Sequence, residues 1–157
     1  MRVHLLAVGT KMPAWVDAGY REYADRLRGE IRLDLREIPA EKRTRSSDVA
    51  RVLAREGERL LAAVPKNCAI VALDVLGTVS TTEQLAGELG DWMSAGRDIA
   101  MLIGGPEGLA SACLTRADKR ISLSALTFPH PLVRVIIAEQ LYRAHSLLRN
   151  HPYHRAG

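Results

Sequence analysis

The sequence has few cysteines, few aromatic residues and no long apolar run. Of its 157 residues, 4% are aromatic and two are cysteines, Cys68 and Cys113. Two isolated cysteines form no metal-binding or redox motif, so we expect both to be small buried hydrophobic side chains. No stretch approaches the ~18 apolar residues of a transmembrane helix. The apolar start at 1–9 is too short for a signal peptide and has no cleavage site. We therefore expect a cytoplasmic protein that does not interact with membranes.

Several common enzyme signatures are also missing. The chain has no Gly-x-Ser-x-Gly, no His-Glu-x-x-His and no Walker A loop, which argues against familiar hydrolases and P-loop enzymes. The segment around Gly9 does not carry the dinucleotide fingerprint, which argues against an NAD-binding enzyme. His151 and His154 are three residues apart but have no neighbouring cysteine or acid. We therefore expect no metal site.

The length, composition and charge of the chain are those of a small globular protein with a basic C-terminal segment. A chain of 157 residues suits one domain spanning 1–157, and its 47% hydrophobic and 25% charged residues are ordinary for a globular protein. The net charge is +4, and residues 134–157 hold four arginines against Glu139 alone. Such a basic C-terminal segment favours a polyanionic partner, chiefly RNA or DNA, although an ordinary solvated face explains it equally well.

Apolar and amphipathic segments alternate five times along the chain. Continuous apolar or alternating patterns predict strands at 3–8, 31–38, 68–75, 99–103 and 121–126. Of these, 31–38 alternates strictly, which is typical of an edge strand, and Gly77 is expected to end the third. The order predicts an α/β fold with a mostly parallel sheet and helices on both faces.

Helical spacing and capping residues mark the segments between the strands. Ser47 is expected to cap the second helix, and Thr81 with Gln84 forms a capping box for the third. A short helix is expected over 108–117 and a long one over 131–148, after a Pro-His-Pro entry.

Two segments follow predicted strands at the edge where parallel sheets bind ligands. Gly104-Gly105-Pro106-Glu107-Gly108 lets the backbone approach a ligand closely, or simply makes a tight turn. The segment 123–128 combines small, hydroxyl and apolar side chains, which suit a flat purine, although alone it is equally an ordinary strand end. Arg143 lies four residues after Glu139, a spacing that predicts a surface ion pair or a phosphate contact.

Six segments in order resemble the bacterial ribosomal RNA large subunit methyltransferase H family. They are Ala7–Pro13, Leu102–Gly108, Ser124–Pro131, Val133–Val135, Glu139–Ala144 and Asn150–Arg155. The resemblance spans essentially the whole chain and implies the SPOUT methyltransferase fold with a C-terminal trefoil knot, an exception to the rule against knots. It also implies S-adenosylmethionine as methyl donor, a homodimer, and methylation at N3 of a pseudouridine in 23S ribosomal RNA of the assembled ribosome.

The resemblance also implies which residues form the site. The cofactor would be held by Leu73, Gly104, Gly105, Leu123, Ser124, Ala125, Leu126, Thr127 and Phe128. Arg143, Tyr153 and His154 correspond to positions near the substrate pocket. His154 is the candidate base, because histidine exchanges protons near neutral pH. Tyr153 would stack on or hydrogen-bond the target base, and Arg143 would hold a phosphate or the developing anion.

A second interpretation is a non-catalytic RNA-binding or ribosome-binding α/β protein. It explains the basic C-terminal segment but gives no role to the glycine-rich turn after a strand. Binding of S-adenosylmethionine separates the two interpretations.

Overall fold

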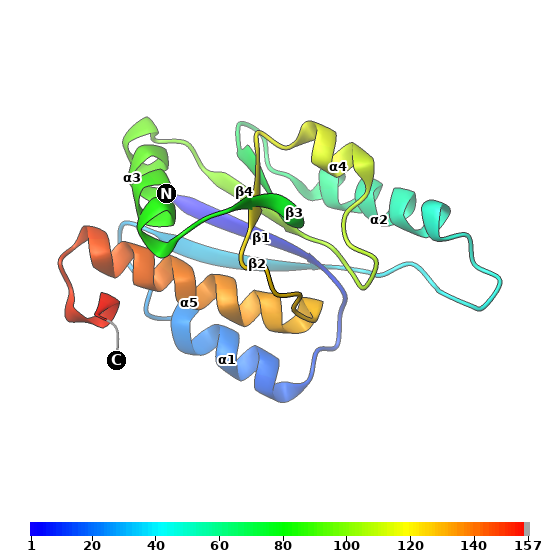
Figure 1. Ribbon diagram of the computed structural model, residues 1–157, viewed down its shortest axis with the longest axis horizontal. Helices are drawn as coiled ribbons and strands as arrows, with labels where there is room; N and C mark the ends of the chain where they lie inside the picture. The colour runs from blue at the N-terminus through cyan, green and yellow to red at the C-terminus, as the bar shows by residue number, and fades with distance from the viewer. Residues whose placement is uncertain (156–157) are drawn as a thin grey trace.

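The computed structural model describes residues 1–155 (Figure 1). Its strands are β1 Arg2–Val8, β2 Arg32–Ile38, β3 Ala69–Val79, β4 Ile99–Ile103 and β5 Lys119–Ser122. Its helices are α1 Ala14–Ala24, α2 Val49–Ala63, α3 Thr82–Ala95, α4 Ser111–Arg116, α5 His130–Leu148 and the short 3-10 helix η1 Pro152–His154. The described residues therefore alternate strand and helix five times, as the sequence pattern predicts.

The five strands form one sheet in the order β2-β1-β4-β3-β5. Every neighbouring pair is parallel, with Leu5 opposite both Leu35 and Met101, and Val71 opposite Met101. The strictly alternating β2 lies at an edge, as predicted, and the continuous apolar β4 is buried throughout. A strand covered on both faces needs apolar side chains at every position, which explains the difference between the two patterns.

Helices cover both faces of the sheet, which confirms the predicted fold class (Figure 1). One face packs against α1, α3 and α5, with Leu5 and Leu141 in its core. The other packs against α2 and α4, with Leu6 and Cys113 in its core. Leu5 and Leu6 serve opposite cores because successive side chains of a strand point to opposite faces. Both cysteines are buried, as expected.

Two strands, β3 and β5, end at residues other than those predicted. The expectation that Gly77 ends the third strand is wrong, because β3 continues to Val79 after a register shift against β5. A Cβ on Gly77 would lie 2.9 Å from the backbone of Arg120 and Ile121, so the glycine permits close approach of the strands. The last strand ends at Ser122, because local hydrogen bonds made by serine side chains replace the strand ladder beyond it.

One predicted helix cap is confirmed and one is wrong. Thr81 and Gln84 form the capping box of α3. The expected cap of α2, Ser47, instead accepts a hydrogen bond from the Thr44 backbone N–H at 2.7 Å. Asp48 caps α2, accepting from the Ala50 N–H at 3.0 Å. A carboxylate is at least as good an acceptor at a helix N-terminus, and it interacts favourably with the helix dipole.

The chain leaves β5 through residues 123–129 and enters α5. These residues contribute to cavities at the carboxyl end of β3. The trefoil knot implied by the resemblance stays a prediction. No helix in the described part of the chain is long and apolar enough to cross a membrane.

Candidate functional site

A cavity of about 380 Å³ lies where β3 and β5 end and α3 and α5 begin to cover the sheet. Its apolar walls include Leu73 of β3, Met101 of β4 and Ile137 of α5. Hydroxyl and amide groups also line it, contributed by Ser80, Thr81, Thr82, Ser122, Ser124 and Gln140. Its volume falls within the ~300–1,000 Å³ of small-molecule sites, which are mostly apolar with a few polar groups that fix orientation.

Most of the residues predicted to bind the cofactor lie in or beside this cavity. Leu73, Leu123, Ser124 and Phe128 line it, and the same four line an adjoining cavity of about 60 Å³. Leu126 lines the smaller cavity, and its side chain is 71% exposed. Sequence reasoning therefore located the loop that forms one wall.

The predicted loop residues Ala125 and Thr127 are exposed and line neither cavity. The loop curls locally, because the Ser122 hydroxyl donates to the Ser124 carbonyl and the Leu126 N–H donates to the Ser124 hydroxyl, each at 2.9 Å. This shape directs Ser124 toward the cavity. A cofactor contact through Ala125 or Thr127 stays a prediction.

The glycine-rich turn follows β4 and lies beside the middle of β3, where Ile103 pairs with Leu73. Gly104 and Gly105 are buried there but line neither cavity. A Cβ on Gly104 would lie 2.2 Å from the Gly108 carbonyl oxygen, so this turn requires glycine. The tight-turn interpretation accounts for Gly104, and a cofactor contact by either glycine stays a prediction.

The predicted catalytic residues Arg143 and Tyr153 are in direct contact. The Arg143 guanidinium lies 5.0 Å from the centre of the Tyr153 ring and donates to the Tyr153 carbonyl at 3.4 Å. Both side chains also meet Glu139, which accepts from Arg143 at 2.8 Å and from the Tyr153 hydroxyl at 3.3 Å. The predicted ion pair between Glu139 and Arg143 is therefore present.

An aromatic cluster places η1 against α5 and α1. The rings of Tyr142 and Tyr153 are 4.6 Å apart, and the Arg26 guanidinium lies 5.5 Å from Tyr142 and 5.8 Å from Tyr153. Tyr23 of α1 lies 5.6 Å from the same guanidinium. Three of the four tyrosines in the chain thus gather at one end of α5. Sequence reasoning missed Tyr23, Tyr142 and Arg26, because only the fold brings α1 next to the tail.

The residues of this cluster differ in their protonation and in their hydrogen bonds. Burial, with a hydrogen bond to Tyr23 and the charge of Glu139, raises the pKa of Tyr153 to about 12. The hydroxyl therefore stays protonated near neutral pH, where it is a hydrogen-bond donor and not a base. The hydrogen bond to Glu139 raises the pKa of Arg143, which stays charged. His154 is half-buried, and its Nδ1 lies within hydrogen-bond reach of the His151 carbonyl.

The three predicted catalytic residues do not line the cavity of their own chain. Hydrogen bonds connect the cavity to the cluster around Arg143. Thr82 donates to Gln140 at 2.8 Å, and Gln140 donates to Glu139 at 2.7 Å. Thr82 and Gln140 line the cavity, and Glu139 holds Arg143. Sequence reasoning missed both Thr82 and Gln140, since polar residues on helices carry no signal without the fold.

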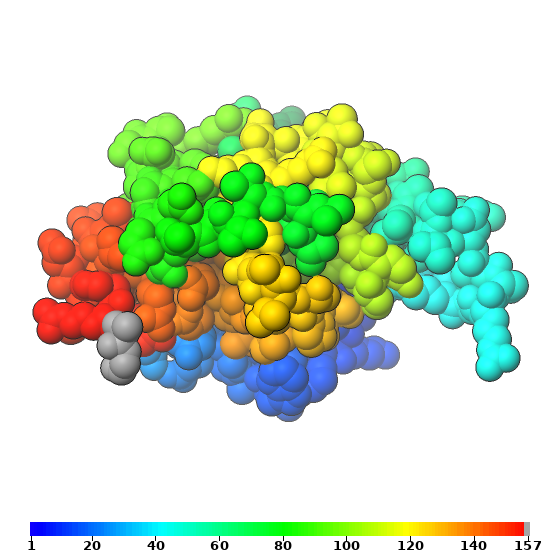
Figure 2. Space-filling view, viewed as in Figure 1, coloured from blue at the N-terminus to red at the C-terminus, as the bar shows by residue number. Residues whose placement is uncertain are grey.

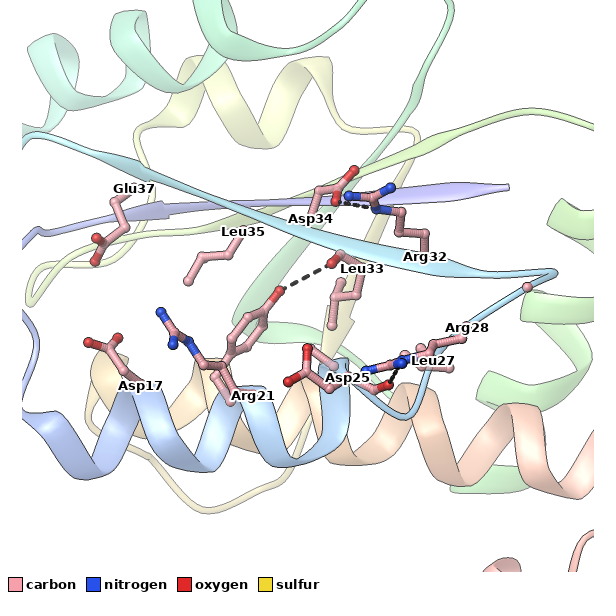
Figure 3. A pocket seen from close by; sticks show the side chains of 13 residues that line it. Asp17, Arg21, Asp25, Leu27, Arg28, Arg32, Leu33, Asp34, Leu35 and Glu37 are labelled. Carbon is pink, nitrogen blue, oxygen red and sulfur yellow. Dashed lines mark hydrogen bonds and ion pairs between the residues drawn. The ribbon is translucent and has the colours of Figure 1, made fainter.

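A larger and more open hollow, of about 1,100 Å³, lies between α1 and β2 (Figure 3). Charged side chains of both signs line it, namely Asp17, Arg21, Asp25, Arg28, Arg32, Asp34 and Glu37. The Tyr20 hydroxyl reaches into this space and donates to the Leu33 carbonyl at 3.5 Å. None of the predicted site residues lines it, and its mixed charges favour no single class of ligand. Among residues 1–155, no three His, Cys, Asp or Glu residues gather as metal ligands.

Comparison with known proteins finds a family model and two relatives that match nearly the whole chain. Residues 1–154 match a family model described as "Predicted SPOUT methyltransferase". The chain is 61% identical over 155 residues to the ribosomal RNA large subunit methyltransferase H of Thioalkalivibrio sulfidiphilus, covering 99% of each chain. It is 59% identical over 155 residues to the protein of the same name from Methylococcus capsulatus, covering 99% of this chain and 100% of that one.

Two solved structures share the fold at low sequence identity. A probable methylase family protein from Haemophilus influenzae has a TM-score of 0.53 at 14% identity, over 99% of this chain and 70% of that one. A probable rRNA-methyltransferase from Porphyromonas gingivalis has a TM-score of 0.55 at 13% identity, over 94% of this chain and 69% of that one. At these identities the two structures speak for the fold alone.

Proposed function

This chain belongs to the SPOUT methyltransferase family, and we propose that it transfers the methyl group of S-adenosylmethionine to ribosomal RNA of the large subunit. The observation that carries the proposal is the cavity at the carboxyl ends of β3 and β5, in a chain about 60% identical over its length to relatives named for this activity. The non-catalytic alternative gives this cavity no role.

The cavity suits the proposed cofactor in size and chemistry. Leu73, Leu123 and Phe128 offer apolar surface for a flat base, while Ser124 and Gln140 offer hydrogen-bonding groups to a ribose or an amino-acid moiety. When bound, the cofactor supplies an electrophilic methyl group on a sulfonium centre. Isothermal calorimetry with S-adenosylmethionine tests this assignment. Loss of binding is expected when Ser124→Trp fills the cavity, and no binding to the unaltered chain at millimolar cofactor would contradict it.

The residues at the end of α5 act on the RNA. We assign to His154 the removal of the proton from N3 of a pseudouridine before methyl transfer. Tyr153, whose hydroxyl donates to Glu139, stacks on the target base or accepts a hydrogen bond from it, and Arg143 stays charged and stabilises the developing anion or a phosphate. His154→Ala is expected to lower the rate by about 10²–10⁴, the usual contribution of a general base. Unchanged rates at every pH would remove His154 from this role.

A homodimer would bring the two parts together. Beside the cavity, Val75, Leu76, Val79 and Leu126 are large apolar side chains exposed to solvent, and Leu76 is 90% exposed. An exposed apolar patch of this kind is typical of a protein interface. Because Arg143, Tyr153 and His154 do not line their own chain's cavity, we propose that the tail of one copy completes the cavity of the other.

Complementation between two inactive variants tests this arrangement. The homodimers of His154→Ala and of Ser124→Trp are each expected to be inactive. If they are mixed so that the chains exchange, each mixed dimer has one intact site, made of one cavity and the other chain's tail. About a quarter of the unaltered activity should return, since half of the randomly paired dimers are mixed and each has one working site. If cavity and tail act within one chain, mixing restores nothing.

We further propose that the substrate is a pseudouridine of 23S ribosomal RNA in the assembled ribosome, which places the protein in the cytoplasm. With a net charge of only +4, a single small domain cannot bind tightly through phosphate contacts alone and also needs the shape of the ribosome. Mass mapping of ribosomal RNA from a deletion strain should reveal one missing methyl group on a pseudouridine. Equal rates on protein-free RNA and on ribosomes would contradict the requirement for assembly.

A further inference from the structure

Residues 40–55, here called the basic arm, follow β2 and form a loop and the first half of α2. Figure 2 shows this cyan segment projecting from one end of the molecule. The arm contains five basic side chains, Lys42, Arg43, Arg45, Arg51 and Arg55. Only Glu41 and Asp48 oppose them, so the arm has a net charge of +3 in a chain of +4.

The acidic groups of the arm are already engaged. Glu41 pairs with Arg59 at 2.7 Å, and the Asp48 carboxylate caps α2. The other four basic residues of the arm, Lys42, Arg45, Arg51 and Arg55, are exposed and form no ion pair within the described part of the chain. Their charge is therefore available to a partner.

Arg43 holds the arm in place. Its guanidinium lies 2.9 Å from Glu56 of α2 and 2.6 Å from Glu107 of the glycine-rich turn. The Glu56 side chain is almost fully buried and also accepts from the Glu41 backbone N–H at 3.0 Å. The free cations thus lie on a tethered loop and on a helix, so less conformational entropy is lost when a partner binds.

Three of the four free cations line a hollow of about 540 Å³ together with hydroxyl groups and the engaged carboxylates of Glu41 and Asp48. Lys42, Arg51 and Arg55 supply charge, while Thr44 and Ser46 supply hydroxyl donors. Ammonium, guanidinium and hydroxyl groups are the side chains that contact nucleic-acid phosphates. The hollow therefore has the chemistry of a phosphate-binding surface.

The charges at the start of α2 also favour an anionic partner. Although the Asp48 carboxylate caps this 15-residue helix, the first turn contains Arg51 and no acidic residue, and the helix dipole disfavours a cation at that position. Arg51 and Arg55 are four residues apart, a spacing at which like charges repel. A phosphate backbone would relieve both unfavourable interactions.

From these observations we infer that the basic arm is a second RNA-contacting surface, which binds backbone phosphates of the ribosomal RNA apart from the methyl-transfer cavity. The inference rests on the proposed function. It also places an RNA contact at the carboxyl end of β2, on a different part of the chain from the tail residues.

The salt dependence of ribosome binding tests this inference. The arm variant carries Lys42→Ala, Arg45→Ala, Arg51→Ala and Arg55→Ala. A control variant removes the same amount of positive charge near the amino ends of the strands, at the opposite end of the sheet. It carries Arg2→Ala, Arg32→Ala, Lys66→Ala and Arg116→Ala. Affinity for purified ribosomes is measured from 50 to 200 mM KCl at constant magnesium. Each lost phosphate contact lowers the slope of log K against log salt by about 0.7–0.9.

The expected slope of the arm variant is smaller than that of the unaltered protein by about 2.8–3.6, so the unaltered protein loses about 50- to 150-fold more affinity between 50 and 200 mM KCl than the arm variant does. The control variant should keep a slope within about one unit of the unaltered protein. An unchanged arm slope, or equal changes in both variants, would overturn the inference. So would arm-dependent binding to vesicles of 30% anionic lipid without arm-dependent binding to ribosomes.

Thermal melts check that both variants fold. If the arm variant unfolds, Lys42→Gln with Arg45→Gln replaces it, since both positions lie outside helices and strands. Its slope should fall by about 1.4–1.8. The outcome is separable from that for the proposed function. If the protein methylates ribosomal RNA but the arm variant keeps the salt slope of the unaltered protein, only the inference about the arm is contradicted. If ribosome binding depends on the arm but no methylation occurs, only the proposed methyltransferase activity is contradicted.

Discussion

Replacing Arg134 should destabilise the protein more than any exposed arginine does. Arg134 lies on α5 and is 0% exposed. It donates to Glu37 at 2.6 Å, to the Gly9 carbonyl at 2.8 Å and to the Val8 carbonyl at 3.3 Å. It therefore ties the first turns of α5 to the carboxyl ends of β1 and β2.

The magnitude follows from what Arg134→Met leaves behind. Methionine fills similar space but donates no hydrogen bond, so the buried Gly9 carbonyl loses a donor, at a cost of ~1–3 kcal/mol. The ion pair adds ~1 kcal/mol or less, because the Glu37 side chain is 36% exposed and water screens it. The expected loss is about 3 kcal/mol, or about 6–12 °C in Tm for a chain of this size.

Urea denaturation and calorimetry measure this loss. Arg36→Met is the matched control, because Arg36 is an exposed arginine of β2 and its replacement should change stability by no more than ~0.5 kcal/mol. If Arg134→Met loses less than about 1 kcal/mol relative to Arg36→Met, the buried contacts do not stabilise the start of α5 as described.

Three further perturbations test the packing and the charges. Gly104→Ala should cost about 2–4 kcal/mol, because its Cβ would lie 2.2 Å from a carbonyl oxygen, whereas Gly87→Ala meets open space in α3 and should stabilise by about 0.5–1 kcal/mol. Equal melting temperatures for these two variants would contradict the turn geometry. Burial and the charge of Arg134 lower the pKa of His130 in the folded state. The unfolded chain therefore takes up a proton at His130 more readily than the folded chain does. The contribution of the neutral His130 to the free energy of unfolding is complete above about pH 6.5 and declines as the pH falls below that value. Melts at pH 7.5 and 5.5 should show the unaltered protein losing more Tm than His130→Gln, and parallel losses would refute the assignment. Burial raises the pKa of Cys113, so a disulfide reagent should label it slowly in the folded protein and rapidly in urea. Rapid labelling in both states would show that Cys113 is accessible.

Periodicity predicted the elements of this fold because burial imposes a pattern. The apolar run of β4 and the alternation of β2 report their places at the centre and edge of the sheet. Gly77 shows the limit of such reasoning. A glycine that ends a strand and one that lets two strands approach closely look the same in the sequence. Only the contact with the backbone of Arg120 distinguishes them.

Some residues of the candidate site could be predicted from the sequence, and others could not. Leu123, Ser124 and Phe128 could be located because a segment after a buried strand lies at the ligand-binding edge. Gln140 and Thr82 could not, since their hydrogen bond joins two helices that are far apart in sequence. Long-range pairs of this kind leave no local pattern.

The most direct test of the proposed function is methyl transfer by the purified protein. Ribosomes from a deletion strain are incubated with S-adenosylmethionine labelled on its methyl group, and the RNA of the large subunit is then digested and mapped. The proposal predicts label at N3 of one pseudouridine of 23S ribosomal RNA and none when Ser124→Trp fills the cavity. Ribosomal RNA without label, from a protein that binds the cofactor, would contradict it.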